Sequence, residues 1–112
     1  MRSLAELHDG SGECILQNVK RIEIVVDSLD FKKLLDDLDA HGVHDYTAMK
    51  GVFGRGSRGE RGGDPFSGAF DNTYVLLACP PEQVDVIVET VRRVLVGRGG
   101  MCLVSDAVWV RH

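Results

Sequence analysis

The sequence predicts a single α+β domain that is built from two successive β-α-β units. The chain has 112 residues, which is enough for one hydrophobic core but too few for two. Several stretches place apolar residues at every second position, as strands do, and two others use the three- and four-residue spacing of amphipathic helices. The composition, 44% hydrophobic and 27% charged, is that of a folded domain and not of a disordered chain.

The first unit contains a strand, a helix and a second strand. Residues 19–26 alternate apolar and charged side chains, which predicts a strand. The following apolar residues have the i, i+3, i+4, i+7 spacing of a helix, and they are Phe31, Leu34, Leu35 and Leu38. Gly42 is a typical helix stop, so residues 45–52 are expected to form the second strand.

The second unit repeats this order. Residues 73–79 are almost wholly apolar, which is typical of a central strand. Pro80 and Pro81 end that strand and open a helix, because proline fits the first helical turn. The apolar stripe of this helix consists of Val84, Ile87, Val88, Val91, Val94 and Leu95. Residues 97–100 end the helix, and residues 101–110 form the last strand.

Two units of this kind normally form a four-stranded antiparallel sheet with both helices on one face, the ferredoxin-like βαββαβ fold. The other face of such a sheet is bare. Residues 73–79 and 101–110 carry apolar side chains on both sides, which predicts that the bare face is covered in an oligomer. Residues 1–17 show no sustained period, so we expect a flexible leader before a domain of residues 18–112.

Charge and composition exclude several classes of protein. Thirteen basic and seventeen acidic residues give a net charge of -4, which argues against nucleic-acid binding by the whole surface. No stretch has the apolar length of a membrane span or a signal peptide, so we expect a cytoplasmic protein. The three cysteines form no CxxC pair, and His41 and His44 need not share a face, so no metal site is predicted.

A long glycine-rich loop, residues 53–72, separates the two units. Its arginines recur at every third residue among glycines, at Arg55, Arg58 and Arg61. Glycine lets backbone N–H groups approach an anion, and arginine offers a planar fork of donors to phosphate or carboxylate. The loop therefore favours phosphate binding, although a solvated loop or a segment that touches RNA has the same composition. Residues 97–100 form a second glycine cluster, which could line the same cleft at a subunit boundary.

These motifs resemble a known family. Residues 20–59 are similar to the opening of PII signal-transduction proteins: Lys-Arg-Ile-Glu in the first strand, Gly-Val-x-x-Tyr-Thr before the second, and Lys-Gly-x-x-Gly-Arg at the start of the loop. Residues 97–100 resemble the family's late glycine turn, so the resemblance covers most of residues 19–112. The loop lacks the tyrosine-bearing uridylylation segment of nitrogen sensors. Its Gly-Ser-Arg-x-x-Arg run, residues 56–61, looks like that of PII-like proteins encoded with carboxysomes and bicarbonate transporters.

The resemblance implies a non-enzymatic sensor of inorganic-carbon or energy status. It implies a homotrimer with an adenine nucleotide in each intersubunit cleft and a T-type loop, at about residues 53–72, that signals to a partner such as a membrane bicarbonate transporter. Gly100 stands where nitrogen-type members carry a phosphate-binding lysine, so AMP or ADP is expected before ATP or cyclic AMP. Bicarbonate is the expected second ligand, and no prosthetic group is implied.

The resemblance also implies the nucleotide-binding residues, position by position. Thr47 would lie beside the base. The phosphate would be gathered by Arg55, Ser57, Arg58 and Arg61. The opposite wall of the cleft would be formed by Gly97, Gly99 and Gly100, and Arg111 would face the nucleotide from the last strand.

Other classes share the predicted fold. An acylphosphatase-like enzyme also uses an arginine and a glycine-rich phosphate cradle, but there the cradle follows the first strand, and here it follows the second. No Ser-His or Cys-His pair is recognisable in the sequence, and no catalytic residue is assigned. A metal-responsive trimer of related fold is a further alternative, without evident ligands.

An RNA-recognition domain would need exposed aromatics on its central strands, where Tyr74 stands nearly alone. Trp109 belongs to the last strand. We expect it to be packed there or at a subunit interface, and not to serve as a stacking platform.

Overall fold

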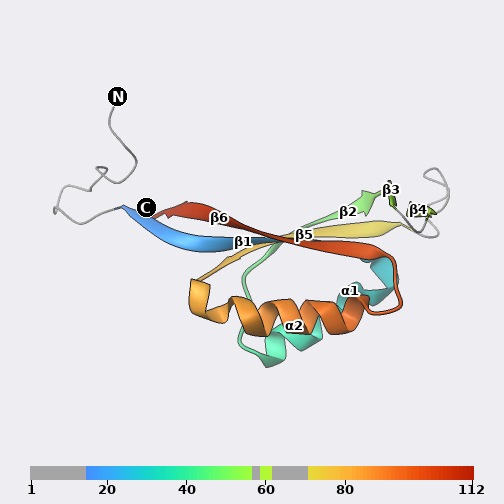
Figure 1. The fold of residues 1–112 in the computed structure, drawn as a ribbon, viewed down its shortest axis with the longest axis horizontal. Helices are drawn as coiled ribbons and strands as arrows, with labels where there is room; N and C mark the ends of the chain where they lie inside the picture. The colour runs from blue at the N-terminus through green and yellow to red at the C-terminus, as the bar shows by residue number, and fades with distance from the viewer. Residues whose placement is uncertain (1–14, 57–58, 62–70) are drawn as a thin grey trace.

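The computed structural model describes residues 15–56, 59–61 and 71–112. A four-stranded antiparallel sheet with strand order β2-β5-β1-β6 carries both long helices on one face (Figure 1). The elements are β1 (Leu16–Asp27), α1 (Phe31–Ala40), β2 (Thr47–Val52), β3 (Gly54–Gly56), β4 (Gly59–Arg61), β5 (Asn72–Cys79), α2 (Val84–Leu95) and β6 (Gly100–Val110). This arrangement confirms the predicted ferredoxin-like fold.

The hydrophobic core lies between the sheet and the two helices. Strand β1 turns Ile22, Ile24 and Val26 toward the helices, and each of these side chains is at most 1% exposed. The register places three β5 residues beside them on the same side of the sheet, namely Val75, Leu77 and Thr73. The helices complete the core with Leu34, Leu38, Ile87, Val91 and Val94. These five helix residues all belong to the apolar stripes that the sequence spacing predicts.

Strand β1 is longer than the sequence pattern indicates. It begins at Leu16, not at Val19, so the last residues of the expected leader are part of the sheet. Leu16 pairs with Val110 at the end of β6, and the backbone N–H of Arg111 donates to the carbonyl of Ile15 over 2.7 Å. The period-2 pattern misses this extension because these residues gain their pairing from β6 and not from a buried face. Residues 1–14 lie outside the described residues.

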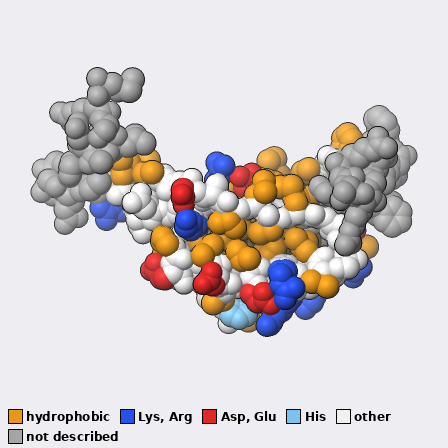
Figure 2. Space-filling view, in the orientation of Figure 1, with side chains coloured by type: hydrophobic (Ala, Val, Ile, Leu, Met, Phe, Trp, Pro, Cys, Tyr) orange, Lys and Arg blue, Asp and Glu red, His pale blue; other side chains and the backbone are white. Residues whose placement is uncertain are grey.

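The face of the sheet opposite the helices is bare, as the helix positions in Figure 1 show. It nevertheless carries large apolar side chains: Met49 is 60% exposed, Leu103 55% and Trp109 50%. The edge strand β6 exposes apolar groups on its helix side too, where Val104 is 44% exposed. Figure 2 shows hydrophobic side chains at the surface along the seam between β6 and α2. One chain thus leaves much of its apolar surface uncovered.

Strand β2 contains a β-bulge before it leaves the sheet. The pairing with β5 shifts between Lys50 and Val52, and Gly51 between them has φ +80°, a left-handed conformation that favours glycine. Beyond Phe53, β3 and β4 pair as a short antiparallel hairpin outside the main sheet. The expected loop of residues 53–72 therefore includes a two-stranded segment, and its residues 57–58 and 62–70 lie outside the described residues.

Candidate functional site

Thr47, the residue expected beside a nucleotide base, begins β2 and borders a surface groove of about 580 Å³. The register pairs Thr47 with Leu76, which lies next to Glu23 on the bare face of the sheet. The groove also reaches Trp109 near the end of β6. Thr47 thus presents a hydroxyl, both donor and acceptor, beside apolar walls, which is the mixture that small-molecule sites use.

The arginine-bearing loop begins at the other end of β2. The backbone pairs Arg55 with Glu60 and Gly54 with Arg61 across the β3–β4 hairpin, so both arginines belong to one short two-stranded unit. Ser57 and Arg58, the other two residues expected to gather phosphate, lie outside the described residues. The hairpin extends from the end of the sheet that is opposite the start of β1 and the end of β6 (Figure 1).

The second glycine cluster forms the turn from α2 into β6. Gly100 has φ +132°, and a Cβ at this position would lie 2.4 Å from the carbonyl oxygen of Val25 and 3.0 Å from Leu95. Only glycine therefore allows β6 to approach β1 here. The turn is also tied to the first unit, because Arg98 forms an ion pair of 3.2 Å with Asp30. The turn is thus fixed by its close approach to β1 and by the ion pair to Asp30.

One chain does not bring all the expected ligand residues together. The strand register places the hairpin and the glycine turn at the same end of the sheet, since Val52 pairs with Asn72, Asn72 with Asp27, and Gly100 with Val26. They are nevertheless on opposite edges, because the strand order places β2 at one edge and β6 at the other. Gly97 and Gly99 lie with Gly100, but Thr47 and Arg111 are elsewhere, and the backbone of Arg111 is hydrogen-bonded to Ile15.

A polar row crosses the bare face. The Arg21 guanidinium donates to Ser105 of β6 over 3.2 Å and pairs with Glu23 over 3.2 Å, and the Tyr74 hydroxyl donates to Glu23 over 3.0 Å. Partial burial and the hydrogen bond to the Glu23 carboxylate both raise the pKa of Tyr74, so the hydroxyl keeps its proton as a donor. The row links β6, β1 and β5 by charge-assisted hydrogen bonds.

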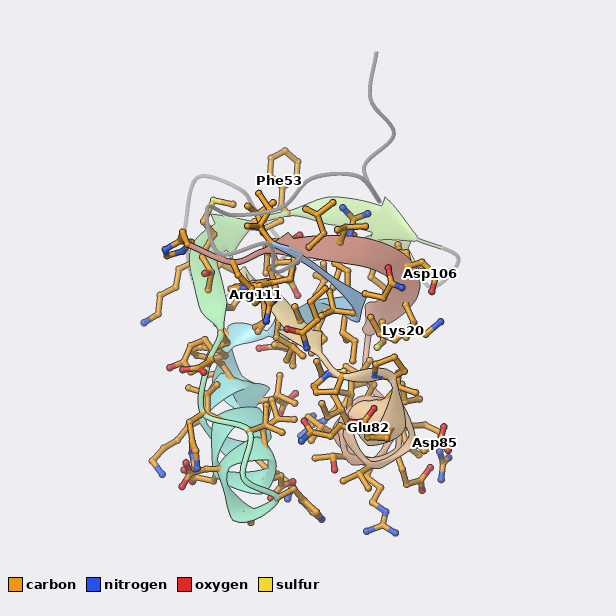
Figure 3. All side chains as sticks on the ribbon, turned by 90° about the vertical axis from the view of Figure 1, so that its left-hand side faces the viewer. Lys20, Phe53, Glu82, Asp85, Asp106 and Arg111 are labelled. Atoms are coloured by element: carbon orange, nitrogen blue, oxygen red, sulfur yellow. The ribbon has the colours of Figure 1, made fainter. Side chains whose placement is uncertain are left out.

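A second ion pair lies on the helix side of the β6 edge. Figure 3 shows Lys20 and Asp106 side by side at this edge, where the ammonium donates to the carboxylate over 2.5 Å. The same view shows the Phe53 ring, 63% exposed, on the side of the sheet away from the helices. The β6 edge of the sheet thus carries an exposed ion pair, and the end of β2 carries an exposed aromatic ring.

The described residues offer few other chemical groups. Among residues 15–56, 59–61 and 71–112, no three His, Cys, Asp or Glu side chains gather closely enough to hold a metal ion. Cys79 and Cys102 are free thiols, and burial raises the pKa of each, which favours the protonated thiol at neutral pH. In the described part of the chain, no helix is long and apolar enough to cross a membrane.

Sequence reasoning missed the groove beside Thr47. Trp109 is 50% exposed in the single chain and lines the groove, so it is not packed within the last strand, and its expected place at a subunit interface stays a prediction. The signal is present in the alternation of residues 101–110, which puts Trp109 on the bare face. Finding the groove needs the register, because the groove forms only where β1 and β6 run past the end of β5.

The fold and the two glycine clusters define a ferredoxin-like domain of the PII type. The sequence profile of the family described as "Nitrogen regulatory protein P-II" matches residues 19–112, and the chain belongs to this family. No curated protein sequence matches the chain.

Solved structures agree with this assignment. CPII, a nitrogen regulatory PII-like protein from Thiomonas intermedia K12 bound to ADP, AMP and bicarbonate, is 27% identical with a TM-score of 0.75. The match covers 86% of this chain and 92% of that protein. CPII bound to ADP and bicarbonate is 26% identical with a TM-score of 0.74 and the same coverage. A PII-like signaling protein from Thermus thermophilus is 25% identical, with a TM-score of 0.65 and coverage of 85% and 92%.

Proposed function

We propose that this chain is a non-enzymatic sensor that binds AMP or ADP, together with bicarbonate, in clefts between copies of itself. The observation that carries the proposal is the placement of the two glycine clusters at the same end of the sheet but on opposite edges. In a closed ring of copies, the β2 edge of one chain faces the β6 edge of the next. The arginine hairpin of one copy then meets the glycine turn of its neighbour in one cleft.

The bare face supports a trimer as the closed ring. Its exposed apolar side chains, Met49, Leu103 and Trp109 among them, would be buried if the three sheets faced a common axis. The polar row of Arg21, Glu23 and Tyr74 is internally paired, so its burial would leave no isolated charge. Burial of this face between copies would therefore remove apolar surface from water without leaving an unpaired charge.

The ligands follow from the chemistry of the clusters and from the similar structures. Arg55, Arg58 and Arg61 supply donors that match phosphate and bicarbonate oxygens, and Gly97, Gly99 and Gly100 supply close backbone. The CPII structures carry ADP, AMP and bicarbonate. The T-type loop at about residues 53–72 would change its order when an anion binds, and this change would be the signal to a protein partner. We propose that the partner is a membrane bicarbonate transporter of the kind encoded near carboxysomes.

Calorimetry with the full chain tests the proposal. AMP, ADP, ATP and cyclic AMP are each titrated with and without bicarbonate, and we expect roughly micromolar affinity for AMP or ADP. Arg58→Ala should weaken binding, whereas Arg93→Ala, which removes an exposed arginine of α2, should leave it unchanged. Absence of binding by all four nucleotides would refute the proposal. Hydrolysis of acetyl phosphate without nucleotide binding would instead support the acylphosphatase-like alternative.

A further inference from the structure

A short 3-10 helix, η2 (Ser28–Asp30), joins β1 to α1 at the end of the sheet where the arginine-bearing loop begins and ends. Its backbone is fixed locally, because the carboxylate of Asp27 accepts from the N–H of Leu29 over 2.8 Å. The register places η2 next to both ends of the loop, since Asp27 pairs with Asn72 and Asn72 with Val52. Figure 1 shows the start of α1 and the turn from α2 into β6 at this same end, on the helix side of the sheet.

Ser28 joins η2 to the neck of the loop, which is the Val52–Asn72 pair and the first residues of β5. The Ser28 N–H donates to the carbonyl of Asp71 over 3.1 Å, and its hydroxyl lies 2.8 Å from that of Thr73, which is 0% exposed. The side-chain amide of Asn72, itself 2% exposed, donates to the carbonyl of Val52 over 3.3 Å. Buried polar groups that lose a partner cost free energy, so these bonds hold the neck against η2.

Asp30 joins η2 to the glycine turn. It stands at the N-cap of α1, where an Asp side chain usually accepts from the backbone of the first helical turn, but it makes no such bond. Its side chain is 14% exposed and pairs with Arg98 over 3.2 Å. A carboxylate with so little exposure needs a partner of opposite charge. The carboxylate therefore restrains the turn that carries Arg98 instead of capping its own helix.

We infer that Ser28 and Asp30 are positioning residues, which hold the neck of the loop and the glycine turn in a fixed relative position. The inference rests on the proposed function, because these two parts of the chain supply its donors for phosphate and bicarbonate. In a ring of identical copies, each chain gives its loop to one cleft and its glycine turn to the next, so one spacing within the chain sets the spacing across every cleft. Donors that are already in place bind an anion without a further ordering cost.

Calorimetry with AMP and ADP on the full chain tests the link to the glycine turn. Asp30→Asn keeps the size of the side chain but removes its charge, and it should weaken both nucleotides about fivefold. Arg98→Gln breaks the same ion pair from its exposed side. The losses should not add in the double variant, because both substitutions remove one interaction. Asp36→Asn, which removes an exposed ion pair with Lys32 on α1, is the matched control and should bind like the natural chain.

Hydrogen exchange without nucleotide separates positioning from a general loss of stability. The N–H groups of Ser28 and Arg98 both donate to backbone carbonyls, over 3.1 Å and 2.8 Å. Asp30→Asn should speed exchange at both of them by a factor of about three or more, while the core amides of Ile22 and Ile24 keep their rates. Equal acceleration at the core amides would reveal a merely structural role and overturn the inference.

The binding outcomes separate this inference from the proposed function. If AMP or ADP binds to the natural chain and equally well to Asp30→Asn and Arg98→Gln, Ser28 and Asp30 are not positioning residues, and the sensor function stands. Tighter binding by Asp30→Asn would show that Asp30 withdraws Arg98 from the ligand, and it would also overturn the inference. If the natural chain binds no adenine nucleotide, the proposed function fails and the positioning role fails with it.

Discussion

The two faces of the sheet have similar sequences but opposite environments. Toward the helices, Ile22, Ile24 and Val75 are each 0% exposed. On the other face, in the same strands and their neighbours, Met49 and Leu103 are more than half exposed. Strand alternation therefore does not reveal which apolar side is covered within the chain. It reveals only that both sides carry apolar residues, and among the described residues no helix covers the second side.

The largest effect is expected on the covered face. Ile24→Ala should lower the free energy of unfolding by about 3 kcal/mol, because it removes buried methyl groups and leaves a cavity. Chemical denaturation measures this loss. Val86→Ala, which truncates a 48% exposed residue of α2, is the control and should cost less than about 0.5 kcal/mol. Equal losses from the two variants would contradict the difference between covered and uncovered surface.

The edge of the covered face should also tolerate little change. Gly100→Ala places a methyl group 2.4 Å from the carbonyl oxygen of Val25 at φ +132°, so we expect a loss of about 2 kcal/mol or more. Gly99→Ala has no atom within 4 Å of its added carbon and should cost much less. The same denaturation curves compare the pair. A Gly99→Ala variant that is as unstable as Gly100→Ala would show that turn flexibility matters more than the approach of β6 to β1.

A charge placed on the bare face should weaken the association of the chains. Leu103→Asp introduces a charge where we propose that three sheets meet, so the association constant should fall at least about tenfold, roughly 1.4 kcal/mol. Analytical ultracentrifugation across a dilution series measures it. Val86→Asp puts the same charge on the outer surface of α2 and should assemble normally. If Leu103→Asp associates as tightly as the natural chain, the bare face is not the contact surface.

A smaller effect is expected in the polar row of the bare face. Tyr74→Phe removes the hydroxyl that donates to Glu23 over 3.0 Å, and it should cost less than about 1 kcal/mol of unfolding free energy. Tyr46→Phe keeps the ring, which contacts Phe31 edge to face at a centroid distance of 6.3 Å, and should be nearly silent. Thermal unfolding followed by circular dichroism compares them. A greater loss from Tyr46→Phe would argue against the row as a stabilising element.

The smallest effect is expected on the solvent side of α2. Hydrogen bonds from Arg92, aided by Arg93, lower the pKa of Glu89 to about 2. Because the folded pKa lies below the ordinary 4.5, the stabilisation is complete above about pH 5 and is lost as the pH falls toward 2. Glu89→Gln should therefore lower the melting temperature slightly at pH 7 and by much less at pH 2, where the carboxyl is about half protonated. A difference as large at pH 2 as at pH 7 would show that charge is not the cause.

Periodicity was sufficient for the helices and the central strands, since Leu34, Leu38, Ile87 and Val91 combine helical spacing with burial. It failed where structure depends on pairing instead of burial. Leu16 joins β1 through its partner Val110, and no local pattern marks it. The candidate site was predictable only in part, because Thr47 and the glycine clusters carry recognisable motifs, whereas the position of Trp109 across a groove depends on how far β1 and β6 run past the end of β5.

The bulge at Gly51 sets the phase of the chain that follows it. Before the bulge, Met49 shares the bare face with Tyr74, and Lys50 lies on the other side with Thr73. After it, Val52 pairs with Asn72 and so takes the side of Met49, one residue out of step with simple alternation. The side that Val52 takes at the end of β2 is therefore set by the extra residue at one glycine. A deletion of Gly51 would remove this extra residue and leave Val52 opposite Asn72 in a regular ladder, so it would straighten the end of β2 without changing the side that Val52 takes.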